Sequence, residues 1–164
     1  MRKPLPLIIL SEVLMVDPVT LGSYPLFKDV SPAVLEKISA FCHDITFEKG
    51  QIIFREGEKA DKLHFLISGS IALRVNIMTK PEFVTVSFVS KSYDCFGWSG
   101  LVSPHHYTAS AYCEEDCKVR TISGKELLKI LSDNPEAGFK VMHRIANLVS
   151  DRLRNSRTAL LKTL

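Results

Sequence analysis

The chain has 164 residues, of which 46% are hydrophobic and 24% charged, so it can build one domain with a core but not two large ones. The net charge of +3 is small and does not by itself indicate a nucleic-acid-binding protein. No stretch approaches the roughly 20 consecutive apolar residues of a membrane-spanning helix, so we expect no integral membrane segment.

The N-terminus imitates a secretory signal, because Arg2 and Lys3 precede a short apolar run that ends at Leu10. Pro6 interrupts this run, and no small-residue cleavage site follows it. We therefore expect residues 1–23 to form an arm that packs on the domain. Without an export signal, reduced cysteines and a cytoplasmic location are the simpler expectation.

The segment 31–41 predicts the first helix, because Ser31 can cap it, Pro32 suits its first turn and apolar residues recur at helical spacing. From residue 45 to 122 the chain breaks into short apolar runs separated by turn residues, which is typical of an antiparallel sandwich or barrel. The expected strands are 45–48, 51–54, 62–67, 70–77, 82–89, 93–96, 107–113 and 118–122.

The helical period returns after Gly124, where residues 125–134 predict a short helix and Pro135 opens a longer one. Apolar residues on the long helix are three and four apart, a heptad pattern formed by Phe139, Met142, Ala146, Val149, Leu153 and, after the polar Ser156, Leu160. This seam can pack along its own domain or against a second copy. Because it continues beyond what a compact domain covers, we expect residues 136–164 to be a dimerisation helix and residues 139–160 to form a homodimer.

The same helix carries six basic side chains: Lys140, Arg144, Arg152, Arg154, Arg157 and Lys162. We expect them to form a solvated outer face, and an acidic partner or a membrane surface is the alternative.

A zinc site can be drawn from Cys113 and Cys117, which are four residues apart, together with His105 and His106. However, no CxxC pair is present, and the acidic residues 114–116 are typical of a turn. We therefore expect no metal.

Motifs of catalysis are missing as well, since the sequence has no GxSxG, no phosphate-binding loop and no HExxH. A metal-binding cupin is the remaining enzyme alternative. It needs clustered histidines, whereas His64 stands alone and the adjacent His105 and His106 would point to opposite faces of a strand. We expect no enzyme and no catalytic residue.

Two segments then carry a resemblance. In residues 47–73, Gly50, Gly57 and Gly69 each separate apolar runs where tight turns require glycine. In residues 95–111, here called the cassette, Phe96-Gly97 enters a short apolar turn. Together they resemble the cyclic nucleotide-binding domain of catabolite-activator-type regulators and of the regulatory subunits of cyclic-AMP-dependent kinases.

The resemblance covers roughly residues 24–155 and implies a mainly β fold. This fold is a jelly-roll-like antiparallel β-roll of eight strands, with a flanking N-terminal helix and a long C-terminal helix. The roll itself is expected at residues 24–135. The chain carries no helix-turn-helix after the long helix, so we expect a stand-alone sensor that does not bind DNA directly.

The family's cassette reads Phe-Gly-Glu, a short apolar helix, and then Pro-Arg-x-Ala-Thr/Ser. It implies a candidate ligand pocket made of Phe96, Gly97, Trp98, Ser99, Gly100, Leu101, His106, Tyr107, Thr108, Ala109 and Ser110. In the family the Glu accepts a hydrogen bond from the ribose hydroxyl, and the Arg grips the cyclic phosphate. Here the Glu position holds Trp98, and the Pro-Arg pair is replaced by His106 and Tyr107.

Loss of one partner of a buried charge pair costs about 2–5 kcal/mol, which turns a micromolar site into a millimolar one. We therefore expect a degenerate cassette, filled by its own side chains or used by another ligand. A weakened site for cAMP or cGMP is the alternative, since His105 or His106 can protonate, backbone amides remain and Trp98 can stack on a base. A ligand-free scaffold that binds an unknown protein partner is the second functional hypothesis.

Overall fold

The structure is a computed structural model that describes residues 16–162. The expectation for the N-terminal arm therefore lies mostly outside the described residues. Where the arm enters them, it forms a short helix, α1 (Pro18–Gly22). Leu21 of this helix is fully buried in the core.

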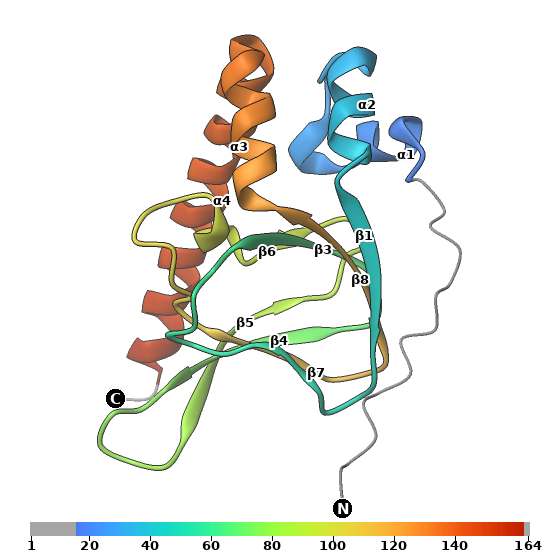
Figure 1. The fold of residues 1–164 in the computed structure, drawn as a ribbon. Helices are drawn as coiled ribbons and strands as arrows, with labels where there is room; N and C mark the ends of the chain where they lie inside the picture. The colour runs from blue at the N-terminus through green and yellow to red at the C-terminus, as the bar shows by residue number, and fades with distance from the viewer. Residues whose placement is uncertain (1–15, 163–164) are drawn as a thin grey trace, which may run out of the picture.

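The eight expected strands are present and form two four-stranded antiparallel sheets, in the orders β1-β8-β3-β6 and β2-β7-β4-β5 (Figure 1). The strands are β1 (Cys42–Phe47), β2 (Ile52–Phe54), β3 (Lys62–Ser68), β4 (Ile71–Asn76), β5 (Phe83–Val89), β6 (Cys95–Phe96), β7 (Ser110–Cys113) and β8 (Cys117–Ser123). The predicted β-roll with flanking helices is confirmed.

The remaining elements are short helices on both sides of the roll and one long helix. They are η1 (Pro25–Phe27), α2 (Pro32–Ser39), η2 (Trp98–Gly100), α3 (Gly124–Asp133) and α4 (Pro135–Leu161). Figure 1 shows α1, α2 and α3 at one end of the roll, and α4 running along its side towards the β4–β5 hairpin.

Several predicted boundaries were wrong by a few residues. Strand β1 begins at Cys42 instead of residue 45, and β7 begins at Ser110 instead of residue 107. The residues before β7 bond to the 57–60 loop instead of continuing the sheet. Ser31 occupies the N-cap position of α2, but its side chain makes no capping hydrogen bond.

The three turn glycines adopt the conformation that the sequence predicted. The φ angles of Gly50, Gly57 and Gly69 are 87°, 85° and 99°, in the left-handed region that other residues rarely adopt. Glycine is therefore required at these three turns because of the backbone conformation that each turn adopts.

The long helix α4 has two different apolar faces. Ala137, Val141 and Ile145 are buried against the domain. The predicted seam lies on another face, where Phe139 is 73% exposed and Leu153 is 71% exposed. Of the heptad residues, Met142 packs against the core, whereas Phe139, Val149, Leu153 and Leu160 stay exposed, so dimerisation through them stays a prediction.

The expected basic outer face of α4 was wrong for three of its six members. Lys140 donates to the carbonyl of Asp29, and Arg144 donates to the carbonyls of Leu26 and Lys28, so both tie α4 to the N-terminal helices. Arg152 turns inward to a cavity in the roll. Arg154 and Arg157 are exposed.

No helix among residues 16–162 is both long enough and apolar enough to cross a membrane.

Candidate functional site

The cassette leaves the sheet through a turn that only glycine fits. Strand β6 pairs with β3, so that Phe96 lies opposite His64. Gly97 follows with φ 72°, and a Cβ on it would lie 2.9 Å from the His64 ring and 3.1 Å from Phe54. The next three residues form η2, whose Gly100 lies against the backbone of Lys62. The glycines of the cassette therefore fix the path of its backbone.

The junction between the cassette and α3 is equally tight. A Cβ on Gly124, the first residue of α3, would lie 2.1 Å from the carbonyl oxygen of Gly100. The amide of Gly124 donates to the carbonyl of Asp61 at 2.9 Å. Main chain thus contacts main chain where η2 meets the helices.

The second half of the cassette is held by the loop at residues 57–60. Tyr107 donates its amide to the Glu58 carbonyl at 2.9 Å and accepts from the Gly57 amide at 2.8 Å. His105 accepts from the Ala60 amide at 2.8 Å. This pairing directs the Tyr107 side chain into the roll, where it is only 6% exposed.

Tyr107 is a core residue with its hydroxyl already committed. Its ring stacks on Phe54 with 3.7 Å between centroids, and its hydroxyl donates to the Lys62 carbonyl at 3.2 Å. Burial, with the nearby Asp61 carboxylate, raises the pKa of Tyr107 to about 12, so the phenol is neutral at physiological pH. Tyr107 therefore gives the cassette neither a charge nor a free donor.

His64 completes this buried group. Its Nε2 lies 3.2 Å from the Tyr107 hydroxyl. Because that hydroxyl donates to Lys62, Nε2 is the protonated nitrogen and donates to the Tyr107 oxygen. Nδ1 is left buried without a hydrogen-bond partner. Burial, and then the charge of Lys62, lowers the pKa of His64 to about 3.

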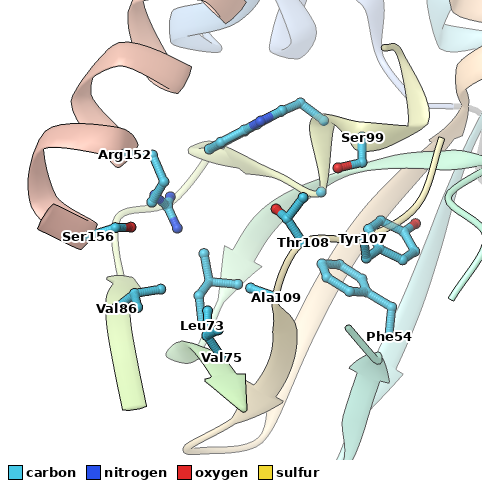
Figure 2. A pocket seen from close by; sticks show the side chains of 12 residues that line it. Phe54, Leu73, Val75, Val86, Ser99, Tyr107, Thr108, Ala109, Arg152 and Ser156 are labelled. Carbon is cyan, nitrogen blue, oxygen red and sulfur yellow. The ribbon is translucent and has the colours of Figure 1, made fainter. Parts of the chain in front are cut away.

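A cavity of about 90 Å³ opens beside this group, between the cassette, strands β4 and β5, and α4 (Figure 2). The lining residues are Phe54, Leu73, Val75, Val86, Gly97, Trp98, Ser99, Tyr107, Thr108, Ala109, Arg152 and Ser156. The volume is well below the ~300–1,000 Å³ of pockets that enclose drug-sized ligands. Its one charged lining residue is Arg152.

The comparisons with known proteins agree with this architecture. The sequence pattern of the family described as the cyclic nucleotide-binding domain matches residues 44–134, more than half of the chain. The chain belongs to the cyclic nucleotide-binding domain family. The matched residues include the whole cassette and α3, and α4 begins directly after them.

Two solved structures of this fold illustrate the likeness. A putative cyclic nucleotide-binding protein from Geobacter metallireducens GS-15 has a TM-score of 0.73 and 31% sequence identity, over 85% of this chain and 99% of that chain. The catabolite activator protein of Thermus thermophilus has a TM-score of 0.67 at 23% identity, over 83% of this chain and 61% of that one. The second likeness supports the fold alone.

Among curated proteins, the cAMP-activated global transcriptional regulator CRP of Pasteurella multocida is 29% identical over 123 residues. The match covers 74% of this chain and 56% of that regulator. The chain therefore spans about half the length of the transcription regulators that it matches.

Six of the eleven candidate residues of this cyclic nucleotide-binding domain line the cavity: Gly97, Trp98, Ser99, Tyr107, Thr108 and Ala109. The other five do not. Phe96 and Leu101 are core residues, and Gly100 is buried against Lys62. Ser110 accepts from the Glu56 amide at 2.9 Å, and His106 is exposed with its Nδ1 2.9 Å from the Pro104 carbonyl. A ligand role for the six lining residues stays a prediction.

The expectations for single side chains of the cassette fared unevenly. Tyr107 points into the roll, because the bridge between His106 and Lys59 turns its side chain inward. His105 and His106 are absent from the cavity lining, so neither supplies the missing cation there. Trp98 is half-buried at the cavity wall, and the expectation that it fills the pocket stays a prediction.

Sequence reasoning missed Arg152 as a lining residue. The signal was present in α4, since Val141, Ile145 and Leu148 form a stripe whose next step of four residues reaches Arg152. Ser156 follows on the same stripe. Arg152 was instead predicted to lie on the outer face of the helix, with the other basic residues.

The residues proposed for a zinc site do not gather. Cys113 and Cys117 are buried within the roll, and no three His, Cys, Asp or Glu side chains of residues 16–162 lie close enough together to hold a metal ion. All four cysteines are free and buried.

The buried His64 predicts a pH dependence of stability. Its folded-state pKa of about 3 lies below the unfolded value near 6.5, so the unfolded chain binds more protons between these pH values. The stability that depends on a neutral His64 is fully present above pH 6.5 and is lost as the pH falls towards 3. Between pH 7 and pH 5, we expect the wild type to lose about 2 kcal/mol more unfolding free energy than His64→Gln.

Urea unfolding of both proteins at pH 7, 6 and 5 measures this difference. Glutamine keeps a donor for Tyr107 but does not titrate in this range. The exposed His43 provides the control, because His43→Gln should retain the pH dependence of the wild type. Parallel stability curves for the wild type and His64→Gln would contradict a buried neutral imidazole.

Proposed function

We propose that this cyclic nucleotide-binding domain is a regulatory module whose cassette is degenerate for cyclic nucleotides, and that it acts through α4 on a second copy. Regulation is favoured over catalysis because the matched relatives include transcription regulators, and the sequence carries no catalytic motif.

The single observation that carries the proposal is the state of Tyr107. The resemblance places the phosphate-binding arginine at this position. Here the side chain is buried, neutral and hydrogen-bonded to the Lys62 carbonyl. A cyclic phosphate entering the cassette would meet no side-chain cation from it, and charged hydrogen bonds are the stronger ones in such sites.

The neighbouring substitution supports the same conclusion. Trp98 stands where the resemblance places the ribose-binding carboxylate, and an indole has no acceptor for a hydroxyl. Its ring also forms part of the wall of a cavity of only about 90 Å³. The lost carboxylate and the small volume therefore oppose the usual ligand, and the one cation in the cavity lining, Arg152, comes from α4 and not from the cassette.

The exposed seam of α4 supports self-association. Phe139, Val149 and Leu153 recur along one face of the helix and are 39–73% exposed in the single copy. A second copy of the same seam would cover them with the interdigitating geometry that a heptad repeat favours. The helix also contributes Arg152 and Ser156 to the cavity, so the contact between copies and the pocket share one element.

Isothermal titration calorimetry with cAMP and with cGMP tests the cassette. We expect no saturable heat below millimolar ligand for the wild type. The double variant Trp98→Glu and Tyr107→Arg should gain binding, and a nucleotide-dependent rise in Tm would show that the variant is folded and occupied.

Micromolar binding of either nucleotide by the wild type would overturn the proposal. The ligand-free scaffold is the second candidate, and the small cavity favours it. It predicts that self-association is unaffected by any occupant of the pocket, whereas the regulatory proposal predicts a change in the dimer dissociation constant.

A further inference from the structure

We propose that Arg152 of α4 is the cation that this pocket offers to a ligand, and that the ligand is a small organic carboxylate with a short apolar body. This inference builds on the proposed function, because it assigns a ligand class to the pocket whose cassette has lost its own cation.

Arg152 reaches the cavity from the opposite side to Tyr107. Figure 2 shows Arg152 and Ser156 extending from α4 towards Val86 of β5 and Leu73 of β4, with Tyr107 and Phe54 across the cavity. The guanidinium carbon lies 5.1 Å from the centroid of the Trp98 ring, within the range of a cation–π contact. The side chain is therefore held at the cavity wall before any ligand is present.

No acidic side chain neutralises this cation. Among residues 16–162, no carboxylate lies within ion-pairing distance of Arg152. The neighbouring Asp151 pairs instead with Arg154, at 3.3 Å on the exposed side of the helix. The buried Cys95 thiol interacts electrostatically with Arg152, but burial raises its pKa to about 12, so it stays neutral. The lining thus carries one positive charge and no negative one.

An unpaired, half-buried guanidinium favours an anion from solution. Burial lowers the pKa of Arg152, yet a guanidinium remains charged at neutral pH. Removing such a charge from water without a partner is costly, and a bound carboxylate offsets that cost through two parallel hydrogen bonds. Charge therefore selects an anionic head group next to α4.

The walls select the body of the ligand. Leu73, Val75 and Val86 line the cavity with aliphatic side chains. The hydroxyls of Ser99 and Thr108 also line it, and neither makes a hydrogen bond to another group in the described part of the chain. Inorganic phosphate would leave the aliphatic walls bare, and a short aliphatic chain would cover them.

The volume sets an upper size. A cavity of about 150 Å³ holds one benzene molecule, and this cavity measures about 90 Å³. A chain of a few carbons fits with its carboxylate at Arg152, whereas most of a nucleotide would lie outside the pocket, on its open side. The bound anion would touch α4 directly, the helix that carries the exposed seam.

The test is a titration of the wild type with sodium butyrate at constant ionic strength. Trp98 is the only tryptophan in the chain, so intrinsic fluorescence reports on the ring beside Arg152. We expect a saturable fluorescence change, with affinity rising about fourfold for each methylene from acetate to propionate to butyrate. Calorimetry with butyrate measures the same affinity without the fluorophore.

The variant Arg152→Gln should weaken butyrate binding at least about tenfold. Arg154→Gln is the matched control, because it removes an exposed arginine from the same turn of helix and should leave the affinity unchanged. Sodium phosphate, which lacks an apolar body, should bind more weakly than butyrate.

Absence of saturable butyrate binding, or equal affinity in the wild type and Arg152→Gln, would overturn the inference. If neither butyrate nor cAMP binds, the carboxylate assignment alone fails and the degenerate cassette stands. Micromolar binding of cAMP, in contrast, would overturn the proposed function, whatever the result with butyrate.

Discussion

Replacing Leu153 by glutamate is expected to convert the proposed dimer through α4 into a monomer. Leu153 is 71% exposed in the single copy and belongs to the seam on α4. In a two-fold dimer the substitution acts once in each copy. Burial of each leucine contributes about 1.5–3 kcal/mol, so the dissociation constant should rise more than ~100-fold.

Analytical ultracentrifugation over a wide range of concentrations measures this change. Asn147→Glu is the matched control, because it adds the same charge at an exposed position of α4 outside the heptad pattern. It should leave the dissociation constant near that of the wild type. A wild type that sediments as a monomer at every concentration would exclude the dimer.

Replacing Gly124 by alanine is expected to cause the largest loss of stability among single small substitutions in this part of the chain. The new methyl group would lie 2.1 Å from the carbonyl oxygen of Gly100, which is main chain and cannot rotate away. Separating η2 from α3 to relieve this overlap should cost about 3 kcal/mol. The Tm should fall by roughly 6–12 °C for a domain of this size.

Thermal and urea unfolding measure the effect, and Gly57→Ala separates it from backbone strain. A Cβ on Gly57 meets nothing within 4 Å, so the only strain in that variant comes from its left-handed φ of 85°. This strain should lower the free energy of unfolding by about 1–2 kcal/mol. If both variants lost the same free energy of unfolding, the close contact between Gly100 and Gly124 would not be the cause of the instability of Gly124→Ala.

The elements of the fold were predictable because each depends on local pattern. The turn glycines and the alternating apolar runs gave the roll, and Gly97 marked the start of the cassette. Only one of the two apolar faces of α4 was predicted. The heptad seam was found, but the inner stripe that ends at Arg152 and Ser156 was not, because the pattern of a helix does not state which stripe meets the roll.

The orientation of cassette side chains could not be predicted from local pattern. Tyr107 points inward because its backbone pairs with Glu58 and Gly57, residues about fifty positions earlier in the chain. The partner of its hydroxyl, the carbonyl of Lys62, is equally distant in sequence. Such contacts depend on how two separate segments meet, and one sequence carries no signal for that.

The absence of side chains between Gly100 and Gly124 has a mechanical consequence. Any shift of η2 reaches the first turn of α3 without a compressible layer to absorb it, since the two backbones already touch. The part of the cavity wall that η2 forms is therefore tied to the helices at two places, to α4 through the contact of Trp98 with Arg152 and to α3 through this junction.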